Sequence, residues 1–319
     1  MHPPEHSYKF DPSYGYTLDK LLAVQTADGP ADFDDFWHRR YEKALTVDPR
    51  PLLANERPAR AGWREFDLNY SSTDAIEIGG WCLVPESEDV ERVFVIMHGY
   101  GGRDGPDYHL PFKNAALFFP CARGISRSAH KSISSDPVWH VLHDIQDPDK
   151  YVHGGCVEDV WLGVSAALNL FPEAEGRVGL LGVSFGGGIG AMALAFDQRI
   201  SRAHFNVPSF GNNLLRLTLP TTGSGASVQV MNRRKPGVVD RSLAYHDAAV
   251  SAKRIRQPVH FACALFDPMV APPGQFAVHN EVVGEKGLFV LRAGHFDYPE
   301  YAEEETLLLH EISEFFEKL

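Results

Sequence analysis

A short segment of the chain has the residue types that could turn a serine into a nucleophile. Residues 182–186, Gly-Val-Ser-Phe-Gly, match the pattern G-x-S-x-G, in which the serine lies on a sharp turn between a strand and a helix. An apolar run at 178–181 precedes the pattern, and an alanine-rich run at 189–196 follows it. The glycines allow a turn tight enough to expose the hydroxyl group. We therefore predict Ser184 as a nucleophile, with a plain glycine-rich turn as the alternative.

Two residues that could activate this serine come later, each after a strand-like run. Asp267 follows residues 259–266, and His295 follows residues 288–294. A serine hydroxyl is a poor nucleophile at neutral pH and needs a histidine to take its proton. The histidine in turn needs a carboxylate that fixes its tautomer and stabilises the imidazolium. The order Ser, Asp, His along the chain is that of one large class of serine hydrolases, so we predict a triad of Ser184, Asp267 and His295.

Both partners of the serine have alternatives. Asp267 could simply be a turn residue at the end of a strand, and His295 could be an ordinary loop histidine among the 15 histidines of the chain. His279 and His310 are rival bases, but both fall inside expected helices. Asp297 is a rival carboxylate, but it lies only two residues from His295 and reaches the far ring nitrogen poorly. The shared placement at strand ends favours the first assignment.

An ester-cleaving serine also needs donors for the oxyanion of the tetrahedral intermediate. The backbone N–H after the nucleophile, that of Phe185, is one candidate. A second donor normally comes from the loop after an earlier strand, where residues 98–102 read His-Gly-Tyr-Gly-Gly. We predict the Tyr100 N–H as this second donor, with an ordinary glycine turn as the alternative.

The elements that must position these residues alternate between strands and helices. Short apolar runs ending in turn residues are typical of a covered parallel sheet, and they occur at 92–102, 115–124, 177–184, 202–208, 259–267 and 287–295. Helical stretches are expected around 156–170, 187–197 and 273–283. Residues 63–72 and 76–85 are expected to form an antiparallel strand pair. The alternation predicts a doubly wound α/β fold with a mostly parallel sheet and helices on both faces.

An N-terminal segment and two insertions lie outside the alternating strands and helices. Residues 1–30, rich in Pro, Tyr and His, are expected to form an extended arm. Insertions at about 125–153 and 210–245 are long enough to form a lid or an interface. The chain ends in an amphipathic helix whose apolar stripe is predicted to contain Leu308, Ile312, Phe315 and Leu319. We expect residues 1–319 to form one domain.

The composition is that of an ordinary globular protein. Of the 319 residues, 44% are hydrophobic and 23% charged, which suits a single large core. The formal net charge of −12 disfavours a nucleic acid or an anionic membrane surface as a partner. The first ten residues contain no apolar run typical of a secretory signal, which predicts a cytoplasmic location. No apolar run approaches the length of a membrane span.

From about residue 30 to the end, the chain resembles the acetyl xylan esterase and cephalosporin C deacetylase family, carbohydrate esterase family seven of the α/β-hydrolases. The resemblance covers most of the chain and rests on a series of motifs in the same order. These motifs are DFDDFW, GGWCLVP, HGYGG, Arg123-Gly124, DPDKYVHGGCVEDVW, GVSFGGG, NVP, SLAYHDAAVSAKRIRQPV, ALFDPMVAPPGQ and AGH.

The resemblance implies the same functional assignments as the residue pattern. The nucleophile of the family falls on Ser184, its carboxylate on Asp267 and its base on His295, and its oxyanion donors fall on the N–H groups of Tyr100 and Phe185. Members remove acetyl groups from small sugars and related esters and need no metal or other cofactor. They usually assemble as homo-oligomers, namely hexamers with the active sites facing inward.

Three apolar residues stand where the family has polar ones. Phe185 replaces a glutamine after the nucleophile, Ile125 replaces a glutamine after Arg-Gly, and Phe296 replaces a glutamate after the histidine. Leaving one member of a buried polar group unpaired costs about 1–3 kcal/mol, so such residues can be lost together. We hypothesise a more apolar pocket that accepts a different acyl or alcohol group. The predicted pocket residues are Tyr100, Arg123, Ile125, Pro208 and Phe296.

The leading interpretation is a serine carboxylesterase that deacetylates small acetylated sugars or related small esters. An acyltransferase or a thioesterase of a biosynthetic pathway would use the same acyl-enzyme on Ser184. An interpretation of another class is a degenerate homologue that only binds a ligand, which the complete triad argues against. All of these interpretations predict a small-molecule partner.

Overall fold

The computed structural model describes residues 4–87 and 89–319, and these residues form a mixed sheet of nine strands. The strands in chain order are β1 (Leu52–Arg60), β2 (Trp63–Ser71), β3 (Glu77–Pro85), β4 (Arg92–Met97), β5 (Ala115–Pro120), β6 (Val178–Val183), β7 (Ile200–Asn206), β8 (Val259–Phe266) and β9 (Lys286–Ala293).

Helices fill most of the connections between these strands. They are α1 (Leu18–Leu22), α2 (Phe33–Leu45), α3 (Pro137–His140), α4 (Val152–Leu170), α5 (Phe185–Leu194), α6 (Asn213–Arg216), α7 (Gly225–Arg234), α8 (Asp240–Tyr245), α9 (Ala248–Ala252), α10 (Pro272–Glu281) and α11 (Tyr301–Phe316). Among the described residues, no helix is both long and apolar enough to cross a bilayer.

The strands follow the order β1-β2-β3-β5-β4-β6-β7-β8-β9 across the sheet. From β5 to β9 the neighbours are parallel, while β1, β2 and β3 extend the sheet as antiparallel strands. This topology confirms the predicted doubly wound and mostly parallel fold. It also brings the carboxyl ends of β4, β6, β8 and β9 to the same edge, where ligands bind in such sheets.

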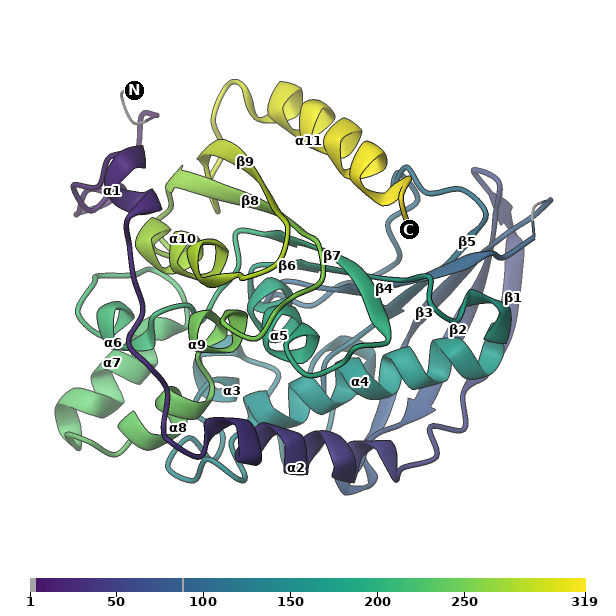
Figure 1. Cartoon of the computed structure of the whole chain (residues 1–319), viewed down its shortest axis with the longest axis horizontal. Coiled ribbons are helices and arrows are strands. Elements are labelled where there is room, and N and C mark those ends of the chain that lie inside the picture. Colours follow the sequence, from purple (N-terminus) through teal and green to yellow (C-terminus); the bar gives the residue numbers. More distant parts are fainter. Residues whose placement is uncertain (1–3, 88) are drawn as a thin grey trace.

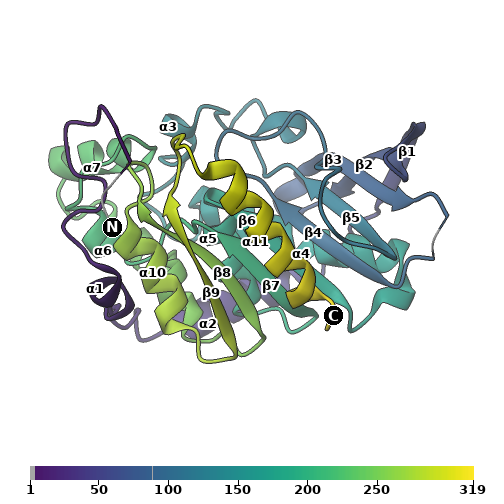
Figure 2. The ribbon, with the colours of Figure 1, turned by 90° about the horizontal axis from the view of Figure 1, so that it is seen from above.

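Helices cover both faces of the sheet, but unequally (Figure 1). On one face α4, α5 and α10 pack against the strands, and α2 and α9 form part of the same apolar core. On the other face α11 lies across the sheet, as Figure 2 shows from above. Residues 98–114, which connect β4 to β5 by turns and irregular structure, complete this second layer through the buried side chain of Phe112.

Strand β1 was not expected from the sequence. All of its residues are exposed or half-buried, and its pairing with β2 shifts register twice. It contains Pro58, which is tolerated at a sheet edge because no ladder bond is needed there. A polar, irregular edge strand has no apolar alternation, so the usual signal for a strand is absent.

The two insertions lie side by side. Residues 125–153 contain α3, and residues 210–245 contain α6, α7 and α8, with α3 in contact with α7. A groove of about 580 Å³ runs between α3 and α7. Its lining includes the exposed side chains of Trp139 and Val230.

The apolar stripe of α11 contains one residue, Phe316, that the sequence pattern did not predict. Leu308, Ile312 and Phe316 are the buried residues of this helix, whereas Phe315 is half-buried. The Phe316 ring packs edge-on against Phe94, with a centroid distance of 5.1 Å. The spacing of four residues from 308 to 312 to 316 follows one face of a helix. Phe315 and Leu319 are partly buried and pack against the same core, so the predicted stripe lacked only Phe316.

Because Phe316 is buried against the sheet and Phe315 is only half-buried, replacing these two adjacent phenylalanines by alanine should have unequal effects. Phe316→Ala should lower the free energy of unfolding by about 3–5 kcal/mol, because it opens a cavity between α11 and the sheet. Phe315→Ala removes a half-buried ring and should cost roughly 1–2 kcal/mol. Urea unfolding of both variants measures the difference, and equal losses would contradict the packing described.

Candidate active site

Ser184 lies on a strained turn between β6 and α5. Its backbone has φ 53° and ψ −111°, a conformation that costs a non-glycine residue on the order of 1–3 kcal/mol. The glycines around it are required by close contact. A Cβ atom at Gly182 would collide with the carbonyl oxygen of Gly186, and one at Gly186 would lie 2.7 Å from the carbonyl oxygen of His98. The sequence pattern therefore produces the sharp strand-to-helix turn that it predicts.

The turn places the Ser184 hydroxyl against His295. Ser184 Oγ lies 2.9 Å from His295 Nε2, and His295 Nδ1 lies 2.7 Å from Asp267 Oδ2. The three side chains thus form a hydrogen-bonded row, although 111 residues separate the serine from the histidine. His295 itself has a positive φ of 59°, which turns its ring back from the end of β9 toward the end of β6.

Asp267 is fully buried, and neutral donors surround its carboxylate. The N–H groups of Met269 and Val270 each donate to Oδ1 at 2.9 Å. The side-chain amide of Gln275, in α10, donates to Oδ2 at 2.9 Å. These bonds hold both carboxylate oxygens in place and leave Oδ2 facing the imidazole.

The electrostatic environment of His295 favours its protonated form. Burial alone would lower the pKa of His295, but the adjacent Asp267 charge and its hydrogen bond raise this pKa above the ordinary value. Below that raised pKa, both ring nitrogens carry protons and Nε2 cannot accept the serine proton. Above it, a neutral ring that donates from Nδ1 to Asp267 presents a free lone pair at Nε2 to Ser184.

Two backbone N–H groups beside Ser184 are available to an incoming oxygen. Among residues 4–87 and 89–319, neither the Phe185 N–H nor the Tyr100 N–H donates to a protein acceptor. Phe185 begins α5, so its N–H also lies at the positive end of a helix. Gly99 is close enough that a Cβ atom there would lie 3.9 Å from Ser184 Cβ, which places the 98–102 loop next to the serine.

Side-chain hydrogen bonds fix the loop that carries the Tyr100 N–H. His98 Nε2 accepts from the Ala122 N–H at 3.0 Å, so Nδ1 carries the proton and donates to the Gly99 carbonyl at 2.6 Å. Burial lowers the pKa of His98 to about 4, and the ring is therefore neutral at pH 7. This neutral tautomer ties the loop to the strand end of β5.

The Tyr100 hydroxyl lies in a layer of buried histidines. His140 Nε2 lies 2.9 Å from the Arg123 carbonyl and must donate to it, so His140 Nδ1 accepts the Tyr100 hydroxyl proton at 3.0 Å. His153 Nε2 then donates to the Tyr100 oxygen at 3.1 Å. The ring of Phe185 lies on Tyr100 with a centroid distance of 4.3 Å.

The other predicted pocket residues differ in what they can offer to a ligand. Phe185 has no exposed surface and Ile125 is only 2% exposed, so neither side chain forms an open wall. Pro208 is buried and contacts α5, one residue before Ser209, whose hydroxyl lies 3.5 Å from Ser184 Oγ. Phe296 is half-buried beside His295, and its ring meets Tyr8 of the N-terminal arm.

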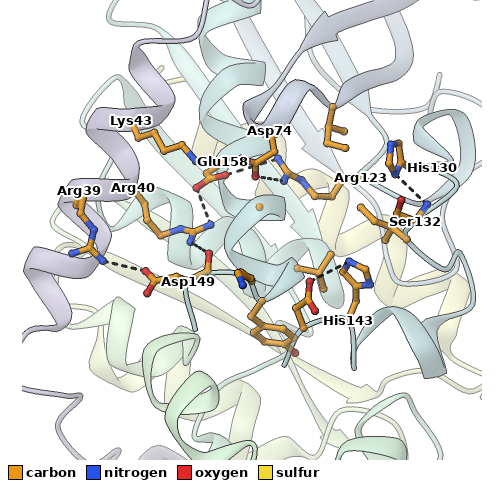
Figure 3. A pocket seen from close by; sticks show the side chains of 17 residues that line it. Arg39, Arg40, Lys43, Asp74, Arg123, His130, Ser132, His143, Asp149 and Glu158 are labelled. Atoms are coloured by element: carbon orange, nitrogen blue, oxygen red, sulfur yellow. Dashed lines mark hydrogen bonds and ion pairs between the residues drawn. The ribbon is translucent and has the colours of Figure 1, made fainter. Parts of the chain in front are cut away.

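Arg123 lies elsewhere, at a charged cavity of about 550 Å³ between α2 and α4 (Figure 3). Its guanidinium forms a buried ion pair with Asp159, at 2.7 Å from Nη2 to Oδ1, and also donates to Thr73 at 2.9 Å. Its hydrogen bonds and ion pairs with the residues that the structure describes do not include Ser184, Asp267 or His295. The structure therefore does not bring this predicted pocket residue to the serine.

The rival residues do not join the site. His310 is exposed on α11 and pairs with Glu314, and His279 bonds to Asn280 in α10. Asp297 is exposed. Gln275, Tyr100 and His153 fall within the quoted motifs, but their hydrogen-bond partners were not predicted, because the pairing of these polar groups depends on contacts between distant segments.

The sheet and the Ser184 turn define the class of the protein: it is an α/β-hydrolase. A family model described as acetyl xylan esterase (AXE1) matches residues 15–311, and the chain therefore belongs to the acetyl xylan esterase family. This membership makes it a hydrolase that acts on carboxylic esters.

Solved structures share the fold. Acetyl xylan esterase 1 from Thermoanaerobacterium sp. JW/SL YS485 superposes with a TM-score of 0.78 at 22% identity, over 95% of this chain and 99% of that chain. Acetyl xylan esterase from Paenibacillus sp. R4 gives the same TM-score and identity over 93% and 99% of the two chains. Acylaminoacyl peptidase from Pyrococcus horikoshii has a TM-score of 0.61 at 16% identity, over 80% of this chain and 42% of that chain.

The placement of Arg123 predicts that its loss affects stability. Arg123→Met leaves the Asp159 charge buried without its partner and should cost about 3–5 kcal/mol of unfolding free energy. Arg39→Met is the control, since the Arg39–Asp149 pair is more than 60% exposed on both sides and should cost at most about 1 kcal/mol. Urea unfolding gives both values, and similar losses would contradict the structural role of Arg123.

Proposed function

We propose that this esterase uses Ser184 as a nucleophile, His295 as general base and acid, and Asp267 as the carboxylate that orients the histidine. The observation that carries the proposal is the hydrogen-bonded row from Ser184 Oγ through His295 to Asp267 Oδ2, at 2.9 and 2.7 Å. Both contacts fall within the distance needed for proton transfer and for fixing the tautomer.

The first half of the proposed reaction forms an acyl-enzyme. Ser184 Oγ attacks the ester carbonyl carbon while its proton moves to His295 Nε2. The negative oxygen of the tetrahedral intermediate accepts hydrogen bonds from the N–H groups of Tyr100 and Phe185, which are free for this purpose. When the intermediate collapses, the bond to the alcohol oxygen breaks, and His295 gives its proton to the departing alcohol.

The second half releases the acid. Water takes the place of the alcohol, gives a proton to His295 Nε2 and attacks the acyl carbon. The same N–H groups hold the second oxyanion. Collapse breaks the bond to Ser184 Oγ, which takes the proton back from His295, and the carboxylic acid leaves. Each proton taken by His295 is returned in the following step, so no metal or other cofactor enters this mechanism.

The proposed substrates are small acetylated sugars or related small acetate esters. Membership in the acetyl xylan esterase family supports an acetyl group as the acyl part. Phe185 and Ile125, two of the three apolar replacements, are buried and offer no surface to a longer acyl chain. The burial of these two side chains argues against the hypothesis of a different acyl group, and we therefore expect acetate to remain the preferred acyl group.

We also propose that the chain assembles into a homo-oligomer. The α3–α7 groove supports this proposal because its apolar rim is exposed in the single chain, with Trp139 63% and Val138 45% exposed. Exposed apolar surface of this kind is typical of protein–protein contacts.

The nucleophile and the acyl preference can be tested together. Hydrolysis of p-nitrophenyl esters from acetate to octanoate should be fastest with acetate, and Ser184→Ala should lower kcat by about 10⁴- to 10⁶-fold. The control is Ser201→Ala, because this hydroxyl bonds the Gly176 carbonyl far from the triad, and its rate should match the wild type. Retained turnover in Ser184→Ala would refute the nucleophile, and a maximum at longer esters would refute the acetyl preference.

The pKa of His295 determines the expected pH dependence. Because that pKa is raised above the ordinary value of 6.5 and the base must be neutral, kcat/KM should fall on the acid side with a midpoint above pH 6.5. Asp267→Asn removes the charge that raises this pKa, so the midpoint should move to lower pH and kcat should drop by about 10⁴-fold. Asp297→Asn, at an exposed carboxylate, is the matched control. A midpoint that Asp267→Asn leaves in place would contradict the assigned role.

A further inference from the structure

The N-terminal arm reaches the turns that carry two members of the proposed triad. The described part of the arm, from residue 4 to α1, lies on the side of the molecule that carries α10, with α1 in contact with α10 (Figures 1 and 2). Residues 4–14 precede the segment that matches the family model, which begins at residue 15. The contacts of these residues with the turns at Asp267 and His295 therefore lie outside the matched segment.

The arm holds the backbone of Asp267 on both sides. The Asp267 N–H donates to the Pro12 carbonyl at 3.0 Å. The Tyr14 hydroxyl lies 3.3 Å from the Asp267 carbonyl oxygen and donates more strongly to the Pro220 carbonyl, at 2.8 Å. One phenol thus links the arm, the turn at Asp267 and the segment before α7.

A compact turn prepares Tyr14 for this role. The Asp11 carboxylate accepts from the backbone N–H of Ser13 at 2.8 Å and from its hydroxyl at 2.7 Å. Tyr14 adopts the left-handed conformation, with φ 54°, and its N–H bonds the Asp11 carbonyl at 3.0 Å. Burial, together with the charges of Asp267 and Asp11, raises the pKa of Tyr14, so the hydroxyl keeps the proton that it donates.

The same arm contacts the residue after His295. The ring of Tyr8 meets Phe296 edge-on at a centroid distance of 5.6 Å, and Phe10 packs on Tyr14 at the same distance. Between these anchors the arm spans a cavity of about 750 Å³ that it shares with Phe266. The arm therefore rests on discrete contacts, and these contacts fall on the two turns that carry Asp267 and His295.

We propose that residues 8–14 form a positioning strap, in which Tyr14 holds the Asp267 turn and Tyr8 holds the His295 loop at the separation that proton transfer from Ser184 requires. The proposal rests on the proposed function of these three residues. A displacement of about 1 Å at a reacting group can reduce the rate by about 100-fold. Among the described residues, no hydrogen bond or ring contact joins either tyrosine to Ser184 or His295, so both act through the alignment of His295.

The test compares Tyr14→Phe with Tyr16→Phe. Both variants lose one phenol oxygen from the arm, but the Tyr16 hydroxyl makes no hydrogen bond among the described residues. Tyr14→Phe should lower kcat on p-nitrophenyl acetate by about tenfold, with KM changed less than about twofold. Tyr16→Phe should match the wild type. Circular dichroism melting checks that both variants are folded.

A second readout does not depend on turnover. Titration of the His295 ring by NMR, assigned with a His295→Gln spectrum, reports its contact with Asp267. A looser contact weakens the attraction that raises the His295 pKa. The titration midpoint should therefore move to lower pH by about half a unit in Tyr14→Phe and stay in place in Tyr16→Phe.

The outcomes separate the strap from the proposed function. If Ser184→Ala is inactive while Tyr14→Phe keeps the wild-type kcat and His295 midpoint, the strap is refuted and the nucleophile stands. If Ser184→Ala retains its rate, the proposed function fails, and the strap is then judged by the midpoint of the His295 NMR titration alone. A shift of this midpoint in Tyr14→Phe supports the strap, and an unchanged midpoint overturns it.

Discussion

The strained backbone of Ser184 is the constraint on which the site depends. A serine does not hold φ 53° and ψ −111° unless its surroundings hold it there. The Ser184 N–H donates to the Asn206 carbonyl at 2.8 Å, the Ser184 carbonyl accepts from Ser209 at 2.9 Å, and the Gly186 N–H donates to the His98 carbonyl at 3.1 Å. The turn is thus fixed by the ends of both neighbouring strands, β4 and β7. The same bonds that offset the strain set the distance from Ser184 to the 98–102 loop.

The side chains packed behind the 98–102 loop explain why an apolar residue is suited to position 185. Phe185 fills the space between the rings of Tyr100 and Phe210, at centroid distances of 4.3 and 6.0 Å. The polar groups in this layer, Tyr100, His140 and His153, satisfy one another. A side-chain amide at position 185 would need its own partners here, and an aromatic ring needs none. The change from a polar to an apolar side chain therefore acts on the support of the 98–102 loop.

Local sequence signals predicted the parts of the fold that local rules determine. The parallel strands were visible because each is a short apolar run, and Ser184, Asp267 and His295 were visible because each ends such a run at the same edge of the sheet. Strand β1 lacked a signal because an edge strand needs no apolar alternation. The pocket assignments for Arg123 and Ile125 came from the resemblance alone, and the direction of those side chains depends on distant partners such as Asp159.

Two buried carboxylates show why the same residue type has different roles. Asp159 pairs with the guanidinium of Arg123, so the two charges largely cancel and act mainly on stability. Asp267 is equally buried, but its fixed partners are the neutral N–H groups of Met269 and Val270 and the amide of Gln275. These donors hold the carboxylate without neutralising it. Its charge remains available to the imidazole of His295, whose pKa it raises against the opposing effect of burial. The arm then acts on the position of this charge, because its contacts with the Asp267 backbone fix where the carboxylate stands relative to His295.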